Sequence, residues 1–322
     1  MKQSLDFIVI GAQKSGTTAL FEYLRHHPEL YLPSGKEAPF FSHDSEWNDG
    51  WSEYVRRYFA LAPGAARWGT VTPHYMYGSL CQAAKPESLA AVSRPERLVP
   101  ERIASHSPEA RLVAILRDPV ERAYSHFRME CFREAEQRTF DAAIDDLLDP
   151  QQLGQSRRQP TEATAYVTNG EYGRILSPYF ELFGKERILV CFASDLSDTP
   201  ATTFASILEF LDVASDFQPS NLGERYRVAG SRRRLRRLNL DSVERRVASN
   251  SHLRSAWHAL PGGLRGRIDR GFKEFKYQAD VRNRVVEPDV EAPSELVSER
   301  LRAHYAPDRE RLRLLIDREP QW

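Results

Sequence analysis

The chain has 322 residues, of which 41% are hydrophobic and 28% charged, a balance that is ordinary for a globular protein and excludes a disordered one. Its 45 basic residues equal its 45 acidic residues, so the net charge is zero and nothing in it indicates a nucleic-acid partner. The three cysteines, Cys81, Cys131 and Cys191, are odd in number and far apart, which excludes a complete disulfide framework and a C-x-x-C metal pair.

Near the N-terminus the sequence offers only the apolar run FIVI, which is too short for a signal peptide or a membrane span. No other stretch of the sequence reaches the length of a transmembrane helix. Together with the cysteine usage, this predicts a cytoplasmic protein without membrane insertion.

The first expected element is a strand over residues 6–10, a continuous apolar run that ends at Gly11. Such runs are typical of strands buried on both faces of a parallel sheet. Residues 17–26 have the apolar spacing of a helix, and Pro28 follows just beyond its end. The sequence therefore predicts a strand, a glycine-containing loop and a helix in succession.

A second unit of the same kind begins with a strand expected over residues 112–116. The next helix has Asp118 as a suitable N-cap and Pro119 as a suitable first residue. A third strand is expected over residues 188–192.

Other segments predict helices and loops around these strands. Helices are expected over residues 139–148, capped by Thr139, and over 202–211, and the last forty residues have a helical pattern. Residues 148–165 are rich in Gln, Pro, Arg and Thr and predict a loop. The strongly basic segment 231–275 predicts a helical surface or lid segment.

Strands that alternate with helices place the chain in the α/β class, with a central parallel β-sheet flanked by helices. Length alone permits one large domain or two small ones. Because no linker rich in Pro, Gly or Ser separates two cores, we expect a single domain over residues 1–322.

The loop IGAQKSGTTAL nearly matches a nucleotide-binding P-loop. Gly11 and Gly16 have the right separation and Thr18 occupies the hydroxyl position, but Thr17 replaces the lysine and Lys14 stands three residues earlier. Backbone N–H groups at a helix N-terminus bind anions whatever the side chains, so the loop is expected to hold a phosphate. A triphosphate would lack its main counter-charge there.

A second anion site is expected in RDPVERAYSHF. Arg117 closes a strand and Ser125 lies two helical turns later, so both side chains can face one phosphate. The alternative is that Arg117 and Asp118 only form a structural helix cap.

FIVIGAQKSGTTALFEYLRHHPEL resembles the 5′-phosphosulfate-binding loop of the sulfotransferases that use 3′-phosphoadenosine 5′-phosphosulfate (PAPS). It is most similar to the branch with the heparan sulfate N- and O-sulfotransferases and their bacterial relatives. RDPVERAYSHF is similar to the family's 3′-phosphate-binding element. The resemblance implies a P-loop-like sulfotransferase fold and PAPS as sulfate donor. No cluster of metal ligands stands out in the sequence, so no metal is expected. It assigns Lys14 to the sulfate-bearing phosphate, and it assigns the remaining cofactor contacts to Ser15, Gly16, Thr17, Thr18, Arg117 and Ser125.

Three weaker similarities add further candidates. LPSGKEAPFF resembles the family's K-E-x-x-F-F stretch, which makes Glu37 the general base, although from the residues alone Lys36 and Glu37 are equally solvated loop charges. GEYGRIL resembles the family's G-x-Y segment, so Tyr172 contacts cofactor or acceptor, or packs in the core. AGSRRRL resembles a cofactor-clamping loop containing Arg232 or Arg233, although basic helix faces also have this composition.

The expected activity is in-line transfer of the sulfuryl group from PAPS to a hydroxyl or amine of a carbohydrate, glycolipid or small-molecule acceptor. Lys14 and Glu37 are the expected catalytic residues, with His43 or His74 as the base if Glu37 does not act. The alternatives are a small-molecule kinase that uses ATP and magnesium, or a non-catalytic nucleotide-binding pseudoenzyme. Because Thr70 and Val71 replace charged residues of the family and Pro39 replaces a histidine that heparan-acting members often have, a polyanionic heparan-like acceptor is not expected.

Overall fold

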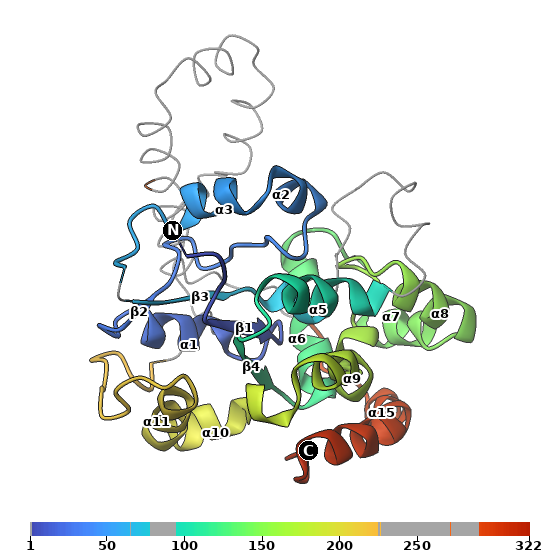
Figure 1. Ribbon diagram of the computed structural model, residues 1–322. Helices are drawn as coiled ribbons and strands as arrows, with labels where there is room; N and C mark the ends of the chain where they lie inside the picture. Colours follow the sequence, from blue (N-terminus) through green and yellow to red (C-terminus); the bar gives the residue numbers. More distant parts are fainter. Residues whose placement is uncertain (1, 65, 78–94, 225, 227–270, 272–289) are drawn as a thin grey trace.

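The computed structural model describes residues 2–64, 66–77, 95–224, 226, 271 and 290–322 (Figure 1). Within them, five parallel strands form a sheet in the order β2-β3-β1-β4-β5. The strands are β1 (Phe7–Gly11), β2 (Leu30–Tyr31), β3 (Arg67–Val71), β4 (Arg111–Leu116) and β5 (Ile188–Phe192). This confirms the expected α/β architecture.

Strand β1 lies at the centre of the sheet because it pairs with β3 on one side and with β4 on the other. Phe7 stands opposite Gly69 of β3, where a Cβ atom would come within 2.2 Å of the Phe7 ring. Glycine at that position therefore lets the Phe7 side chain lie flat on the neighbouring strand. Ligands of open α/β sheets bind beyond the carboxyl ends of the strands, where neighbouring connections diverge, and β1 provides that point here.

Helices cover both faces of the sheet (Figure 1). Phe7 and Val9 of β1 belong to one apolar cluster, and Ile8 and Ile10 belong to another, as the alternation of strand side chains requires. The described α-helices are α1 (Thr17–Leu24), α2 (Asp44–Asp49), α3 (Trp51–Tyr58), α5 (Pro95–His106), α6 (Pro119–Phe132), α7 (Phe140–Leu147), α8 (Pro150–Arg158), α9 (Tyr172–Phe183), α10 (Ala193–Asp198), α11 (Pro200–Phe210) and α15 (Glu295–Ile316). Short 3-10 turns are η1 (Pro73–Tyr77), η2 (Thr168–Gly170) and η3 (Lys185–Arg187). No helix in the described ranges is both long and apolar enough to cross a bilayer.

The expected helix caps are confirmed. The Asp118 carboxylate accepts hydrogen bonds from the backbone N–H groups of Val120 at 2.8 Å and Glu121 at 3.0 Å. The Thr139 hydroxyl accepts one from Ala142 N at 3.2 Å. The helix expected over 202–211 begins two residues earlier, at Pro200.

The prediction of a loop over residues 148–165 is wrong over its first half, because Pro150–Arg158 forms α8. Asp149 caps this helix by accepting hydrogen bonds from Gln151 N at 2.9 Å and Gln152 N at 3.2 Å, and Pro150 takes the first helical position. Only Ser156 of α8 is buried, so the helix has no apolar stripe to reveal it in the sequence. The basic segment 231–275 lies outside the described residues apart from residue 271, so its role and the single-domain assignment stay predictions.

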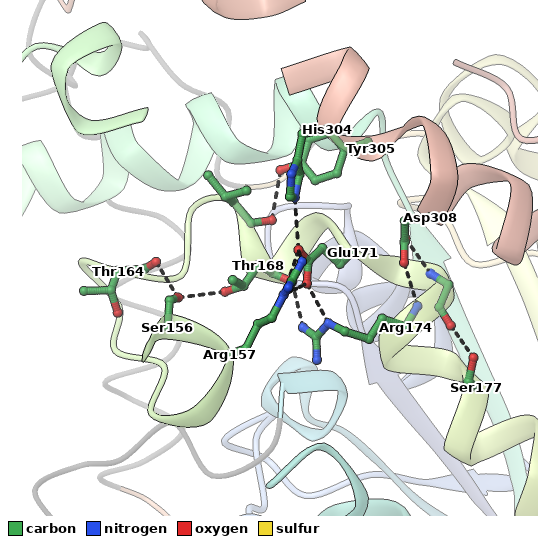
Figure 2. A network of polar contacts seen from close by, with 12 residues as sticks. Ser156, Arg157, Thr164, Thr168, Glu171, Arg174, Ser177, His304, Tyr305 and Asp308 are labelled. Atoms are coloured by element: carbon green, nitrogen blue, oxygen red, sulfur yellow. Dashed lines mark hydrogen bonds and ion pairs between the residues drawn. The ribbon is translucent and has the colours of Figure 1, made fainter. Parts of the chain in front are cut away.

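Helix α15, which confirms the expected C-terminal helix, packs along α9 (Figure 1). A Cβ atom at Gly173 of α9 would meet the Asp308 backbone oxygen at 2.4 Å, so glycine permits the close approach of the two helices. The Asp308 carboxylate accepts hydrogen bonds from Gly173 N and Arg174 N, both at 2.8 Å (Figure 2). Helix α15 therefore caps the N-terminus of α9.

A buried carboxylate, Glu171, lies at the centre of the polar network beside this contact (Figure 2). Its oxygens accept hydrogen bonds from Arg157 and Arg174 at 2.6 Å and lie 3.0 Å from His304 Nε2. Burial raises the pKa of Glu171, but the three cationic or hydrogen-bonding partners outweigh burial and lower the pKa to about 2. Glu171 thus joins α8, α9 and α15 through its charge.

The Glu171→Gln substitution should lower the unfolding free energy by about 3 kcal/mol at pH 7, because it removes the buried anion to which Arg157, Arg174 and His304 bind. The depressed pKa means that this stabilisation is present above about pH 5 and is lost as the pH falls toward about 2. Urea unfolding of both proteins at several pH values measures the difference. Glu319→Gln, at an exposed ion pair with Arg309, is the control. A difference that stays constant between about pH 7 and pH 3 would contradict the assignment.

Candidate functional site

The loop between β1 and α1 lies beyond the carboxyl end of the central strand. Lys14 and Gly16 have φ angles of 69° and 96°, so the backbone turns through the left-handed region twice before the helix begins. Gly16 is the N-cap residue and offers no side-chain acceptor, and the first turn of α1 contains no acidic residue. The N–H groups at the start of α1 are therefore arranged for an anion rather than for a side-chain cap.

Buried polar atoms in the same loop support this interpretation. Ser15 and Thr17 are only 1% and 4% exposed. The Ser15 hydroxyl and the Gln13 side-chain oxygen are buried without a hydrogen bond of normal geometry. Such atoms are rare because leaving them unpaired costs about 1–3 kcal/mol each. The loop thus fits a polar ligand that the Ser15 hydroxyl can contact.

A cation from another segment takes the place of the missing P-loop lysine. Lys36 is 3% exposed, and its Nζ atom lies 3.4 Å from Thr17 Oγ1, at the residue where a P-loop has its lysine. The same Nζ atom lies 3.4 Å from Glu37 Oε1. The sequence does not indicate this role of Lys36, because nothing in its spacing relates it to a loop nineteen residues earlier.

Glu37, the expected base, lies beside the Lys36 ammonium. Its side chain is 39% exposed, and its second oxygen, Oε2, lies 3.8 Å from His74 Nδ1 in η1. The backbone N–H of Ala38, the next residue, donates a hydrogen bond to the Thr72 hydroxyl at 3.2 Å, which ties this segment to the end of β3. The structure thus brings Glu37, Lys36 and Thr17 into one cluster, of which only the Glu37 side chain is exposed. His43, the other alternative base, is half-buried, and burial followed by the His74 charge lowers its pKa.

A second carboxylate, Glu162, lies on the far side of His74 and was missed in the sequence. Its Oε1 atom is 3.6 Å from His74 Nε2, and its Oε2 atom is 2.7 Å from Nε2 of the fully buried His126 in α6. The Gln13 side-chain amide donates to both Glu162 oxygens, at 3.3 and 3.2 Å. Residue 162 follows the helix that was expected to be a loop, so no pattern marked it.

The charges of this cluster fix the protonation of its members. Burial raises the pKa of Glu162, but hydrogen bonds from His126 and His74 outweigh it and hold the pKa far below its usual range. Burial lowers the pKa of His74, but the Glu162 hydrogen bond and the Glu37 charge reverse this and raise it. Burial and the Arg122 charge lower the pKa of His126 to about 4 despite Glu162, so this ring is neutral near pH 7. Glu162 is therefore ionised between two histidines.

One set of side chains has the spacing of a metal site. The ligand atoms of His126, Glu130 and Glu162 lie within 4.8 Å of one another. However, His126 Nε2 already contacts Glu162, and Glu130 accepts a 2.7 Å hydrogen bond from Arg133. These protein partners occupy the ligand atoms, so the described residues give no positive indication of a metal.

Arg117 follows β4 and faces the loop from the other side. Its guanidinium pairs with Glu121 at 2.9 Å and donates to the Lys14 carbonyl oxygen at 3.5 Å. Ser125 is half-buried in α6, and the structure gives no contact between it and Arg117. Tyr172 is 1% exposed, and its hydroxyl donates to the Arg117 carbonyl at 2.9 Å, so it supports Arg117 from the core. Burial raises the pKa of Tyr172 to about 12.

The structure describes one of the other expected site residues, Thr18, but not Arg232 and Arg233. Thr18 is buried in the first turn of α1, beside Thr17. Arg232 and Arg233 lie outside the described residues, so their expected contacts stay predictions.

The family model and the most similar curated proteins all indicate the same family. The model of the sulfotransferase family matches residues 6–219. The human bifunctional heparan sulfate N-deacetylase/N-sulfotransferase 3 is 28% identical over 223 residues, which cover 66% of this chain and 23% of that protein. The mouse heparan sulfate glucosamine 3-O-sulfotransferase 3B1 is 25% identical over 210 residues, which cover 65% of this chain and 46% of that protein. The match therefore spans less than half the length of each of these relatives.

A solved structure shares the fold along nearly the whole chain. The crystal structure of a sulfotransferase from Alicyclobacillus acidocaldarius superimposes with a TM-score of 0.62 at 19% sequence identity. The match covers 98% of this chain and 97% of that one.

The Lys36→Gln substitution should weaken binding of inorganic pyrophosphate about tenfold, because a charge-assisted contact at the loop is worth about 1.5–3 kcal/mol. Calorimetric titration at low and high salt measures the effect, and the difference should shrink as salt screens the charge. Lys185→Gln, at an exposed lysine paired with Asp317, is the matched control. Equal affinity of Lys36→Gln and the unchanged protein would exclude Lys36 from the anion site.

Proposed function

Since the chain belongs to the sulfotransferase family, we propose that the donor in its sulfuryl transfer is PAPS and that the acceptor is a hydroxyl or amine of a carbohydrate, glycolipid or small molecule. The observation that supports this most directly is the contact of Lys36 Nζ with Thr17 Oγ1 at the start of α1. It gives the loop a cation while leaving Lys14 inside the loop. Two cations at one loop suit the binding of a sulfate-bearing phosphate.

In this proposal the loop residues hold the donor and stabilise its departure. PAPS supplies an activated sulfuryl group whose bond to the 5′-phosphate breaks during transfer. Lys14 and the N–H groups of residues 15–18 hold that phosphate, where positive charge offsets the negative charge that develops on the departing oxygen. Arg117 and Ser125 bind the 3′-phosphate, since a guanidinium fork matches phosphate geometry.

The proposed acceptor end of the site is the exposed side of Glu37. This carboxylate takes the proton of the attacking hydroxyl or amine, while Lys36 keeps it oriented at 3.4 Å. The named relatives act on heparan sulfate, which supports a carbohydrate acceptor. Thr70 and Val71 are fully buried, so these two residues offer an acceptor neither charge nor contact. A neutral sugar or small-molecule alcohol is therefore preferred to a polyanion.

Titration with 3′-phosphoadenosine 5′-phosphate (PAP) and with ATP plus magnesium tests the donor. We expect PAP to bind at least tenfold more tightly, because it offers one phosphate to each of the two proposed sites. Isothermal calorimetry measures both affinities, and a labelled-PAPS screen of a compound library then finds the acceptor. Selective tightening by ATP and magnesium would instead support a kinase.

The two cationic residues should have separable effects. Lys14→Ala should lower kcat about 10²–10³-fold with PAP affinity changed less than about fivefold, because its charge acts mainly as the phosphate departs. Arg117→Ala should weaken PAP binding about tenfold or more and leave kcat at saturating PAPS close to that of the unchanged protein. Steady-state sulfuryl transfer and PAP calorimetry measure the two quantities. The roles would be wrong if the two variants showed the same pattern.

A further inference from the structure

His74 lies between two carboxylates that come from distant parts of the chain. Its Nδ1 atom is 3.8 Å from Glu37 Oε2, and its Nε2 atom is 3.6 Å from Glu162 Oε1. The histidine side chain is 26% exposed, so it also reaches solvent. An imidazole with a carboxylate near each ring nitrogen has the arrangement of a proton relay.

Glu162 is suited to orient the ring and unsuited to act as a base. Hydrogen bonds from Gln13 and from His126 fix both of its oxygens. Its carboxylate therefore stays ionised and accepts the Nε2–H of His74, which leaves Nδ1 as the acceptor nitrogen on the side of Glu37.

We propose that His74 is a positioning residue that accepts, from Glu37, the proton released by the sulfuryl acceptor, with Glu162 fixing its tautomer. This inference rests on the proposed function. The acceptor O–H or N–H bond breaks as its proton passes to Glu37, the bond from the acceptor to sulfur forms, and the bond from sulfur to the 5′-phosphate oxygen breaks. The proton then moves from Glu37 to His74 Nδ1, and the imidazolium later releases it to water.

The direction of this proton movement follows from ordinary acidities. A carboxylic acid is a stronger acid than an imidazolium by about two pKa units in water, so the second transfer is downhill. Lys36 beside Glu37 favours the ionised carboxylate, and Glu162 beside His74 favours the imidazolium. The transfer thus restores an ionised Glu37 for the next turnover. Contacts between catalytic groups are often long without substrate, which accommodates the 3.8 Å separation.

The pH dependence follows from all the charges that face His74. Burial lowers the pKa of His74 and the Lys36 charge adds to this, while the Glu162 hydrogen bond and the charges of Glu37 and Glu162 raise it, and His43 is a nearby titrating ring. The net effect is a raised pKa, and only the neutral ring accepts a proton. The kcat of sulfuryl transfer should therefore rise with pH along an acid limb that lies above about pH 6.5.

The test compares His74→Gln with the unchanged protein by following transfer of labelled sulfuryl groups from PAPS to the acceptor. Hydrolysis of PAPS by water gives an assay that needs no acceptor. A glutamine amide keeps a donor for Glu162 but cannot accept a proton, so a purely structural role would survive the change. We expect kcat to fall about 10²-fold, the acid limb to disappear, and PAP affinity to change less than about twofold.

Two further variants make the outcome decisive. Glu162→Gln removes the anion that favours the imidazolium, so the acid limb should move to lower pH while PAP still binds. His26→Gln, at an exposed histidine, is the control and should match the unchanged protein. If His74→Gln does not fold, the shift in Glu162→Gln alone carries the test.

The results separate the relay from the activity on which it rests. If the protein is active and the acid limb of His74→Gln or Glu162→Gln matches that of the unchanged protein, the relay is wrong. Sulfuryl transfer from PAPS is then unaffected. If the protein binds PAP but neither transfers nor hydrolyses sulfuryl groups, both the proposed activity and the relay are wrong. A protein that does not bind PAP overturns the proposed donor first, and the relay with it.

Discussion

The buried ammonium of Lys36 connects the two halves of the site. It contacts the first residue of α1 and the carboxylate of Glu37, so one charge serves both the anion loop and the proposed base. A charge that is only 3% exposed is strongly unfavourable unless anions or dipoles surround it. The helix N-terminus repels this cation, so the nearby Glu37 carboxylate helps to make its burial favourable.

The sheet order explains why these groups meet. Strand β1 leads into the anion loop, β3 leads through Thr72 to His74, and β4 leads to Arg117, and all three strands run in the same direction. Their carboxyl ends therefore lie side by side, and short connections bring the functional residues to one edge. Residue 162 reaches the same edge because α8 and the segment after it pack beside η2.

Local chemistry made much of the fold predictable from the sequence. The apolar runs of β1, β4 and β5, the Asp118 cap and the left-handed Gly16 each depend on neighbours in the chain. Helix α8 was missed because it is capped at Asp149 but nearly all polar. The Lys36–Thr17 and His74–Glu162 contacts join residues that are 19 and 88 positions apart in the sequence. Sequence periodicity does not indicate contacts between residues so far apart. Ser125, Arg232 and Arg233 remain predictions, since no contact of theirs is described.

The capping of α9 by α15 has a consequence for protein engineering. The family match ends at residue 219, yet Asp308 completes the first turn of α9, and Trp322 packs on the Tyr172 ring with centroids 5.8 Å apart. Tyr172 in turn holds the Arg117 carbonyl. A chimera that contains only residues 6–219 would lack the contacts of Asp308 and Trp322. Moving the β1–α1 loop and Arg117 of this protein to another scaffold therefore also requires α15 and the residues that follow it.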